Sequence, residues 1–446
     1  MHRRGKGLTA LQILALGFAL IIVLGALLLR LPAANRGERL GFLDALFTAT
    51  SATCVTGLVV CDTYTQFTFL GQAVLLCLIQ IGGLGFMTVA VLFSMVLRKR
   101  IGLKERSYLM EAVSSPQLGG VVRFARRILF GTALAEGIGA ALLMLRFCPL
   151  FGLKTGVWYA VFHSVSAFCN AGFDLMGRYG PYSSLEPFRN DPLVLGVIMA
   201  LIIVGGIGFL VWDDVAEHKW HVRRYLLHTK IMLCATFLLL ACSFALFLAL
   251  EDGAAFAGMT DGEKALNAAF MAVTPRTAGF NAVPMDGLSE AGAALTALLM
   301  LVGAGTGSTG GGIKVTTLVV ILLATMHFMR GRGDVNAFHR RVSDGLVRRA
   351  FCGAVLYLLL AFTGCFVLLV QQEGISLMDA AFETFSAIGT VGLSRVGTGE
   401  MTPLSRVALI VLMYSGRVGS LSVAMAFAER KHPAGLRNTL GKVIVG

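Results

Sequence analysis

Four short stretches of the sequence, each centred on one glycine, have residue types and spacing suited to binding a cation. They are Cys54-Val55-Thr56-Gly57-Leu58, Cys169-Asn170-Ala171-Gly172-Phe173, Arg276-Thr277-Ala278-Gly279-Phe280 and Gly389-Thr390-Val391-Gly392-Leu393. A glycine adopts positive φ without steric cost, so successive carbonyl groups of such a stretch can point to the same side. Four such strands around one axis would form rings of carbonyl oxygens, which can replace the hydration shell of a cation. The residues expected to supply these oxygens are Val55, Thr56, Gly57, Asn170, Ala171, Gly172, Thr277, Ala278, Gly279, Thr390, Val391 and Gly392.

The residues before each glycine repeat as well. Three stretches are preceded by Ser-Ala six and five residues before the glycine, and by a phenylalanine ten residues before it. The third has its phenylalanine, Phe270, nine residues before Gly279. A single glycine of this kind is more often a small residue that lets helices pack closely. Four glycines in phase favour the carbonyl ring.

Each glycine stretch must be positioned by the helix that precedes it. Helical patterns of about a dozen residues occupy 43–53, 157–168, 264–274 and 377–387. A helix of that length cannot cross a bilayer, which indicates re-entrant helices that enter the membrane and return. Their partially negative C-termini would then point at the bound cation.

Longer apolar stretches flank these short helices. Eight segments have the length and apolar character of a membrane span: 10–30, 68–97, 122–148, 192–212, 229–250, 292–329, 348–371 and 403–428. We therefore predict an all-α integral membrane protein with four repeats of span, re-entrant pore helix, filter strand and span, forming a pseudo-fourfold pore. The predicted units are 1–97, 98–228 with a cytoplasmic linker at 98–121, 229–347, and 348–446 with a cytoplasmic C-terminus.

Composition supports a membrane protein. Of the 446 residues, 56% are hydrophobic and only 14% are charged, against roughly 25% charged in soluble domains. The net charge of +13 lies in short clusters between apolar stretches, so nucleic acid is not the expected partner. The nine cysteines include no CxxC pair, which argues against a zinc or redox site. The first apolar run, Leu8 to Leu29, is longer than the core of a signal peptide and is interpreted as a retained span.

The distribution of basic residues predicts the orientation. Of the 38 Lys and Arg residues, 25 lie in the N-terminus, in 98–127, 219–230 and 330–349, and after residue 429. By the positive-inside rule these segments are cytoplasmic. Both termini are then cytoplasmic, and the short helices enter from outside.

A glycine-rich run interrupts the segment 292–329. Six of the ten residues from Gly303 to Gly312 are glycine, namely Gly303, Gly305, Gly307, Gly310, Gly311 and Gly312. Three of them satisfy the GxGxxG dinucleotide pattern, but a membrane helix precedes the run where that pattern needs a strand. Polar backbone at this depth is tolerated beside a cavity, which predicts a mobile gate below the carbonyl rings. A static kinked helix is the alternative.

Arg417 lies halfway along the last apolar segment. An arginine in mid-membrane costs about 2.5–3.5 kcal/mol on insertion scales, so it normally faces a cavity and has a role. A fixed positive charge below the carbonyl rings would repel a cation that leaves them. The alternative is a structural ion pair with an acid. The other ionisable residues within spans are Glu136 and Lys314, and no catalytic constellation is found, so we expect no enzyme.

With these motifs, the sequence resembles the superfamily of bacterial Trk/Ktr and plant HKT cation transporters from its first span to its last. Its length and eight spans are most similar to the membrane (pore) subunit of the Ktr system. The resemblance implies K⁺ bound at the filter as the transported ion, a homodimer in the lipids of the cell inner membrane, and a cytosolic nucleotide-binding (RCK-type) ring as regulator. It implies no organic cofactor on this chain.

Two alternatives to a potassium transporter stay open. In the family, serine at the first filter glycine accompanies sodium preference, so Gly57 favours potassium. A sodium-selective or Na⁺-coupled transporter on the same fold is the first alternative, and whether Na⁺ activates transport is not settled by the sequence. An intramembrane enzyme or a secondary transporter of organic solutes is the second. It would require paired acids, a nucleophile with its base, or inverted repeats.

Overall fold

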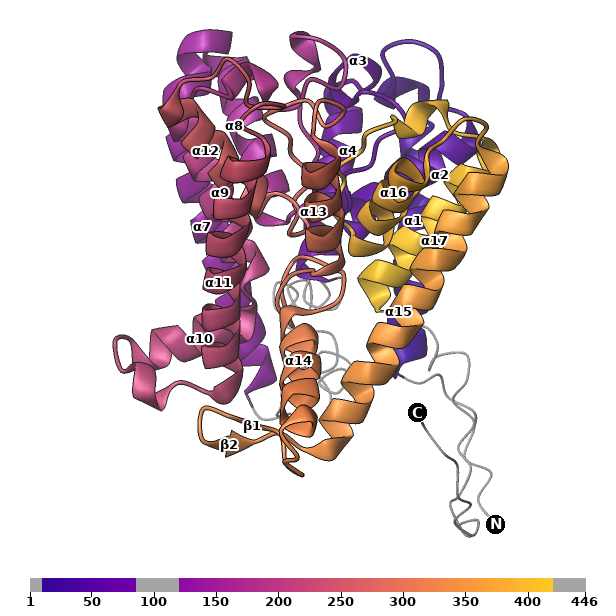
Figure 1. Cartoon of the computed structure of the whole chain (residues 1–446). Coiled ribbons are helices and arrows are strands. Elements are labelled where there is room, and N and C mark those ends of the chain that lie inside the picture. Colours follow the sequence, from indigo (N-terminus) through magenta and orange to yellow (C-terminus); the bar gives the residue numbers. More distant parts are fainter. Residues whose placement is uncertain (1–9, 86–119, 420–446) are drawn as a thin grey trace, which may run out of the picture.

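The computed structural model describes residues 10–85 and 120–419, which form an almost entirely helical molecule (Figure 1). Four successive units follow one plan: a long helix, a short helix, an extended stretch and a second apolar helix. The first contains α1 (Ala10–Leu29), α2 (Phe42–Cys54), the small α3 (Thr63–Gln66) and α4 (Phe69–Leu84). The second contains α7 (Val121–Phe151), α8 (Leu153–Phe168), α9 (Pro192–Gly206) and α10 (Phe209–His218).

The other two units follow in the same order. The third contains α11 (Leu227–Leu250), α12 (Asp261–Val273), α13 (Glu290–Leu301) and α14 (Val315–Met329). A small antiparallel hairpin, β1 (Asn336–Ala337) and β2 (Arg340–Arg341), leads to the fourth unit. That unit contains α15 (Asp344–Gln371), α16 (Leu377–Gly389) and α17 (Pro403–Val418).

The first helix of each unit is long and apolar enough to cross a membrane. The helices α1, α7, α11 and α15 have apolar windows with mean hydropathy between 1.9 and 2.7. Their outer faces expose large apolar side chains, such as Phe130 (72% exposed), Phe237 (70%) and Phe366 (67%). Side chains of this kind are stable in contact with lipid and costly in water. These four helices confirm the predictions at 10–30, 122–148, 229–250 and 348–371.

In each unit, the apolar helix that follows the extended stretch is interrupted at a glycine or ends close to one. The helix α4 ends before Gly85 and α17 before Gly419, both with positive φ. At Gly206-Ile207-Gly208 the chain turns, so that α10 lies 92° from α9. The predicted span at 192–212 is therefore broken, because Gly208 (φ 104°) adopts a conformation that no α-helix contains; a single span through α9 and α10 stays a prediction. The predicted glycine break within 292–329 is confirmed by the separation of α13 from α14.

Part of the predicted pattern lies outside the described residues. This applies to the ends of two expected spans, 86–97 and 420–428, and to most of the linker 98–121 with its basic residues. Among the described residues, four helices qualify as membrane spans by length and composition, or five if α9 and α10 form one broken span. The total of eight spans therefore stays a prediction.

The four predicted short helices are present as α2, α8, α12 and α16, with starts up to four residues earlier than expected. Local caps fix several of these starts. Thr260 and Glu263 form a capping box at α12, and the Ser376 hydroxyl accepts a hydrogen bond from the Asp379 amide at the start of α16. Both arrangements satisfy backbone N–H groups that a helix start leaves unpaired.

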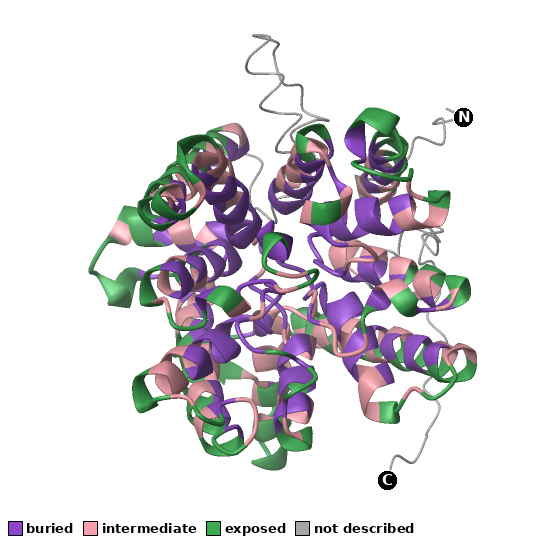
Figure 2. Cartoon of the chain, turned by 90° about the horizontal axis from the view of Figure 1, so that it is seen from above, coloured by how far each residue is buried: buried purple, intermediate pink, exposed green. Residues whose placement is uncertain are grey.

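The short helices surround the centre of the molecule. Seen from above, the longer helices form an outer ring, and buried extended segments lie at its centre (Figure 2). The repeated phenylalanines Phe47, Phe162 and Phe382 are fully buried, and so is Phe270 of the third unit. The phenylalanine repeat thus marks the face by which each short helix packs into the core.

Candidate functional site

The four glycine stretches share one unusual backbone geometry. We call them the glycine strands: residues 55–57, 170–172, 277–279 and 390–392. The residue two before the glycine is left-handed in each strand, with φ of 57° at Val55, 58° at Asn170, 66° at Thr277 and 52° at Thr390. The glycines also have positive φ: 94° at Gly57, 68° at Gly172, 79° at Gly279 and 99° at Gly392. Left-handed β-branched residues are strained, and such strain gathers at functional sites.

The glycine strands close into a ring in chain order. A Cβ atom added to Gly57 would lie 2.6 Å from the Ala171 carbonyl oxygen, and one added to Gly172 would lie 2.8 Å from that of Ala278. A Cβ on Gly279 would overlap the Val391 oxygen, and one on Gly392 the Thr56 oxygen. Each glycine therefore touches the carbonyl of the residue that precedes the next glycine. The structure brings all twelve predicted strand residues to this one centre.

Hydroxyl groups at the ends of the short helices hold the strands. The Gly57 and Gly392 amides each donate to a serine of the Ser-Ala repeat, Ser51 and Ser386, at 3.0 Å. In the second unit the serine at this position, Ser166, instead donates to the Phe173 carbonyl (2.6 Å). The repeated serine is therefore a support for the strand.

The third unit is one residue shorter at this point. In the other three units, the residue before the glycine donates its N–H to a carbonyl five residues back, as Thr56 does to Ser51 (2.8 Å). The Ala278 amide donates to Thr274, only four residues back (3.0 Å). This difference explains why Phe270 precedes its glycine by nine residues rather than ten.

Above the strands lies a cavity of about 490 Å³, here called the upper cavity. The four strand glycines line its floor, and five of its other lining residues are acidic. The acidic residues are Asp62, Asp174, Asp286, Glu186 and Glu400. The one arginine in its described lining, Arg395, is engaged by Asp379 (3.1 Å) and Glu290 (3.5 Å). The carboxylates therefore leave the upper cavity with a net attraction for cations.

The glycine-rich run forms a loop below the strands, between α13 and α14. We call residues 303–313 the glycine loop. Its two ends are paired by a bond from the Gly303 amide to the Ile313 carbonyl (2.8 Å). The Gly305 amide donates to Gly206, and the Phe209 amide donates to Gly307, both at 2.8 Å. The glycine loop is thus fastened to the break between α9 and α10.

Arg417 ties the glycine loop to the first unit. Its guanidinium donates to the Thr309 carbonyl of the loop and to the carbonyls of Gly82 and Gly83 at the end of α4, the last at 3.0 Å. Among the described residues Arg417 makes no ion pair, so the alternative of a structural ion pair with an acid has no support among them. Lys314 binds the loop from its other end, through the Gly310 carbonyl (2.6 Å).

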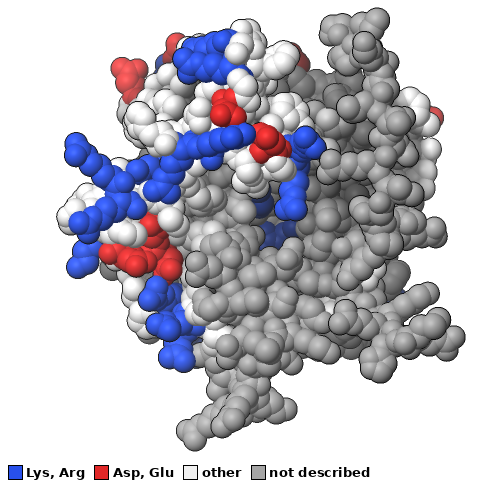
Figure 3. Space-filling model, turned by 90° about the horizontal axis from the view of Figure 1, so that it is seen from below, with Lys and Arg blue, Asp and Glu red and all other residues white. Residues whose placement is uncertain are grey.

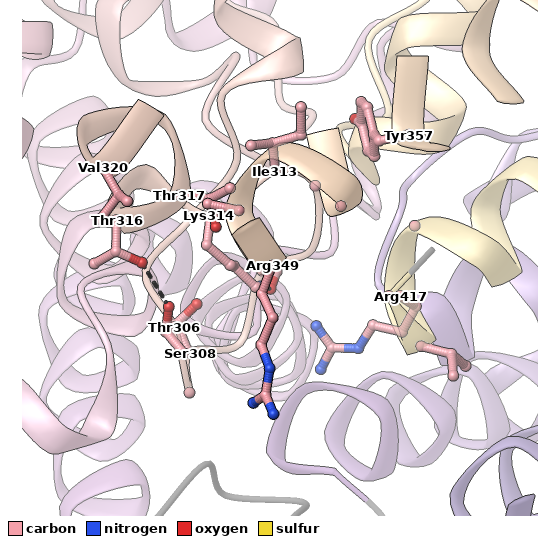
Figure 4. A pocket seen from close by; sticks show the side chains of 18 of the residues that line it. Thr306, Ser308, Ile313, Lys314, Thr316, Thr317, Val320, Arg349, Tyr357 and Arg417 are labelled. Carbon is pink, nitrogen blue, oxygen red and sulfur yellow. Dashed lines mark hydrogen bonds between the residues drawn. The ribbon is translucent and has the colours of Figure 1, made fainter. Parts of the chain in front are cut away.

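Below the glycine loop lies a second space of about 710 Å³, the lower cavity. Figure 4 shows Lys314, Arg349 and Arg417 around it, with a hydrogen bond between the hydroxyls of Thr306 and Thr316 (2.9 Å). Its described lining includes no aspartate or glutamate. The upper cavity therefore borders the strand ring, the glycine loop contacts the ring, and the lower cavity borders the loop.

A second glycine repeat escaped the sequence analysis. Three units contain a pair of glycines three residues apart at the end of α4, α9 or α17: Gly82 and Gly85, Gly205 and Gly208, Gly416 and Gly419. A Cβ on the first member would overlap the carbonyl oxygen of Thr53, Phe168 or Ile388, respectively, at the end of the short helix. The signal was available as a GxxG spacing that recurs 24 to 33 residues after Gly57, Gly172 and Gly392.

These features define a multi-pass membrane protein whose four similar units meet at one central ring. The model of the TrkH family, described as cation transport protein, matches residues 9–436, and the chain belongs to this family. It is 41% identical to the Ktr system potassium uptake protein B of Bacillus subtilis, over 98% of this chain and 96% of that protein.

Two further comparisons agree with this assignment. The chain is 40% identical to the potassium/sodium uptake protein NtpJ of Enterococcus hirae, over 96% of this chain and 95% of that protein. Its structure resembles the crystal structure of the potassium transporter TrkH from Vibrio parahaemolyticus, with a TM-score of 0.75, 18% identity, and coverage of 95% and 86% of the two chains. The family resemblance inferred from the glycine motifs is confirmed.

Proposed function

We propose that this protein takes up potassium through a filter formed by its four glycine strands. The observation that carries the proposal is the closed ring, in which each glycine contacts the carbonyl before the next glycine. Left-handed residues and positive-φ glycines in alternation let consecutive carbonyls face one side. A dehydrated cation at the centre would exchange its water for these oxygens.

Potassium is the proposed ion because of the residue at position 57 and the names of the relatives. Gly57 stands where serine accompanies sodium preference, and the Bacillus subtilis relative is named a potassium uptake protein. A sodium-selective or Na⁺-coupled transporter is the second candidate, favoured by the Enterococcus hirae relative, which is named for both ions. If the protein is a potassium transporter, Na⁺ would act at most as an activator.

The glycine loop and Arg417 are the proposed gate. The loop lies between the strand ring and the lower cavity, and hydrogen bonds from Arg417 and Lys314 hold it there. Because most of its backbone is glycine, few side chains oppose its movement. Release of the Arg417 bonds would open the path from the ring to the lower cavity.

The wider assembly is proposed on the same family basis. The four units, 1–97, 98–228, 229–347 and 348–446, would surround one pore, and two chains would form a dimer. Lysines and arginines gather on the described part of the lower face (Figure 3), and by the positive-inside rule this face would lie in the cytoplasm. Both termini would lie on the same side, as the sequence predicts. A cytosolic RCK-type ring would bind there, and a pull-down with such a ring in native-like detergent tests this contact.

Cation uptake into proteoliposomes tests the function directly. The purified chain is compared with Gly57→Ser for K⁺ and Na⁺ flux. We expect a K⁺ preference in the wild type that weakens in the variant. Equal flux of both ions in the wild type would contradict a potassium filter, and preference for Na⁺ would support the second candidate.

A further inference from the structure

We propose that the glycine loop is bonded directly to the glycine strands, and that Thr390 is the positioning residue that couples gate closure to filter geometry. This inference rests on the proposed function, because it assigns a gate to the loop and a filter to the strands. It adds a specific link between them. Opening the loop would release the residue whose left-handed conformation directs the carbonyls of the fourth strand.

The link with the fourth strand is a hydrogen bond. The Gly311 amide of the loop donates to Thr390 Oγ1 at 3.1 Å, and both groups are buried. A Cβ added to Gly311 would overlap the same hydroxyl. The loop backbone is therefore in direct contact with the residue that precedes Val391 and Gly392.

The loop meets the second and third strands in a similar way. A Cβ added to Gly310 would overlap Thr277 Oγ1, and the Asn170 side-chain amide lies 3.1 Å from that hydroxyl. Thr309 Oγ1 donates to the Phe168 carbonyl (3.1 Å), just before the second strand. Three of the four left-handed residues thus contact the loop or a residue bonded to it.

The first strand differs from the other three. Its left-handed residue is Val55, which has no hydroxyl and is fully buried. Hydrogen bonds between the loop and the first unit run through Arg417 to α4 instead. Val55 also shows that valine adopts this conformation, with φ of 57° against 52° at Thr390.

This geometry gives the coupling a direction. When the loop is closed, the Gly311 amide is buried and its acceptor is Thr390 Oγ1. Without that acceptor the amide stays unpaired only in the closed state, because water in the lower cavity can reach it once the loop moves. Loss of the hydroxyl therefore shifts the equilibrium toward the open loop. By linkage, the strand that loses its loop contact also changes its interaction with ions.

Thr390→Val tests the proposal, since it removes the acceptor and keeps the shape. Hydrogen–deuterium exchange of peptides covering 303–313 should be faster in the variant than in the wild type. Cation flux in liposomes without a cytosolic partner should rise by about tenfold, and the K⁺/Na⁺ ratio should change. Thr390→Ser, which restores a hydroxyl, should return all three measurements toward wild type.

Thr363→Val is the matched control, the same exchange at an exposed position of α15, where the Thr363 hydroxyl donates only to the Leu359 carbonyl of its own helix (2.8 Å). It should leave loop exchange and flux unchanged. Unaltered loop exchange in Thr390→Val would overturn the coupling, whatever the flux. A wild type that passes no cation selectively would refute the proposed function instead, and the exchange measurement would still decide whether Thr390 holds the loop.

Discussion

At the scale of single residues, the four strand positions require glycine for two reasons, the backbone conformation and the close contact with a neighbouring strand. Each has positive φ, and each lies against a carbonyl oxygen of its neighbour in the ring. Most other glycines within 10–85 and 120–419 meet only one of these conditions or neither. Gly137 of α7, for example, has helical φ and no neighbour within 4 Å of an added Cβ. The two classes should respond oppositely to one added methyl group.

Gly392→Ala should therefore abolish selective cation uptake. The new methyl group would overlap the Thr56 carbonyl oxygen and occupy a residue with φ of 99°, where a side chain is strained. Gly137→Ala adds the same group in open space and replaces the poorer helix former, so its uptake should equal wild type. Uptake of K⁺ by the two variants in proteoliposomes, at matched protein content, checks this. Normal uptake by Gly392→Ala would contradict the ring.

The carboxyl groups of the upper cavity predict a dependence on external pH. The pKa of Asp174 is raised to about 7, chiefly by burial and to a smaller extent by the negative charge of Asp62, although the hydrogen bond from the Met176 amide lowers it. The Asp174 carboxylate is thus charged above pH 7 and protonated below it. Cation uptake at low K⁺ should fall as external pH decreases from 8 to 6, because the cavity loses negative charge. Asp174→Asn should be slower at pH 8 and show a weaker pH dependence; an unchanged profile would exclude Asp174 as its source.

At the scale of elements, the sequence predicted the helices better than their ends. Apolar length and the glycine repeat were sufficient to place α1, α7, α11, α15 and the four short helices. Hydropathy does not register backbone φ, so the turn at Gly208 within an apolar run was missed. The carbonyl contacts of Arg417 were also beyond prediction, since they join Gly82, Thr309 and α17 across more than 300 residues of sequence.

Those contacts make Arg417 a bridge between elements. Its guanidinium connects α17, the end of α4 and the glycine loop. Arg417→Ala removes all three links and a positive charge from the lower cavity, so uptake should rise severalfold without a regulatory partner. Arg349→Ala is the matched control, because Arg349 lines the same cavity and its side chain makes no hydrogen bond or ion pair with any other described residue. Equal increases in the two variants would assign the effect to charge alone rather than to loop anchoring.

At the scale of the whole molecule, the four units are alike in plan and unlike in chemistry. Their strands form one ring, but Asn170 carries an amide, Val55 lacks a hydroxyl, and the third unit is a residue short. The repeat made the ring predictable from the sequence. The order in which the strands adjoin, and the contacts of the loop with three of them, depend on packing between units and have no local sequence signal.

The two cavities give the molecule an electrostatic direction. The upper cavity is lined by five carboxylates and one paired arginine, whereas the described lining of the lower cavity contains Lys314, Arg349 and Arg417 and no carboxylate. Cations should therefore accumulate above the ring and be repelled below it, which favours inward over outward flux at equal driving force. Currents across a planar bilayer with uniformly oriented protein, recorded at voltages of opposite sign, measure this asymmetry. Because interactions between charges in water are screened over about 10 Å at 0.1 M salt, the asymmetry should shrink as an impermeant salt is added on both sides. Equal currents in both directions at low salt would show that the two charged linings do not act on the permeating ion.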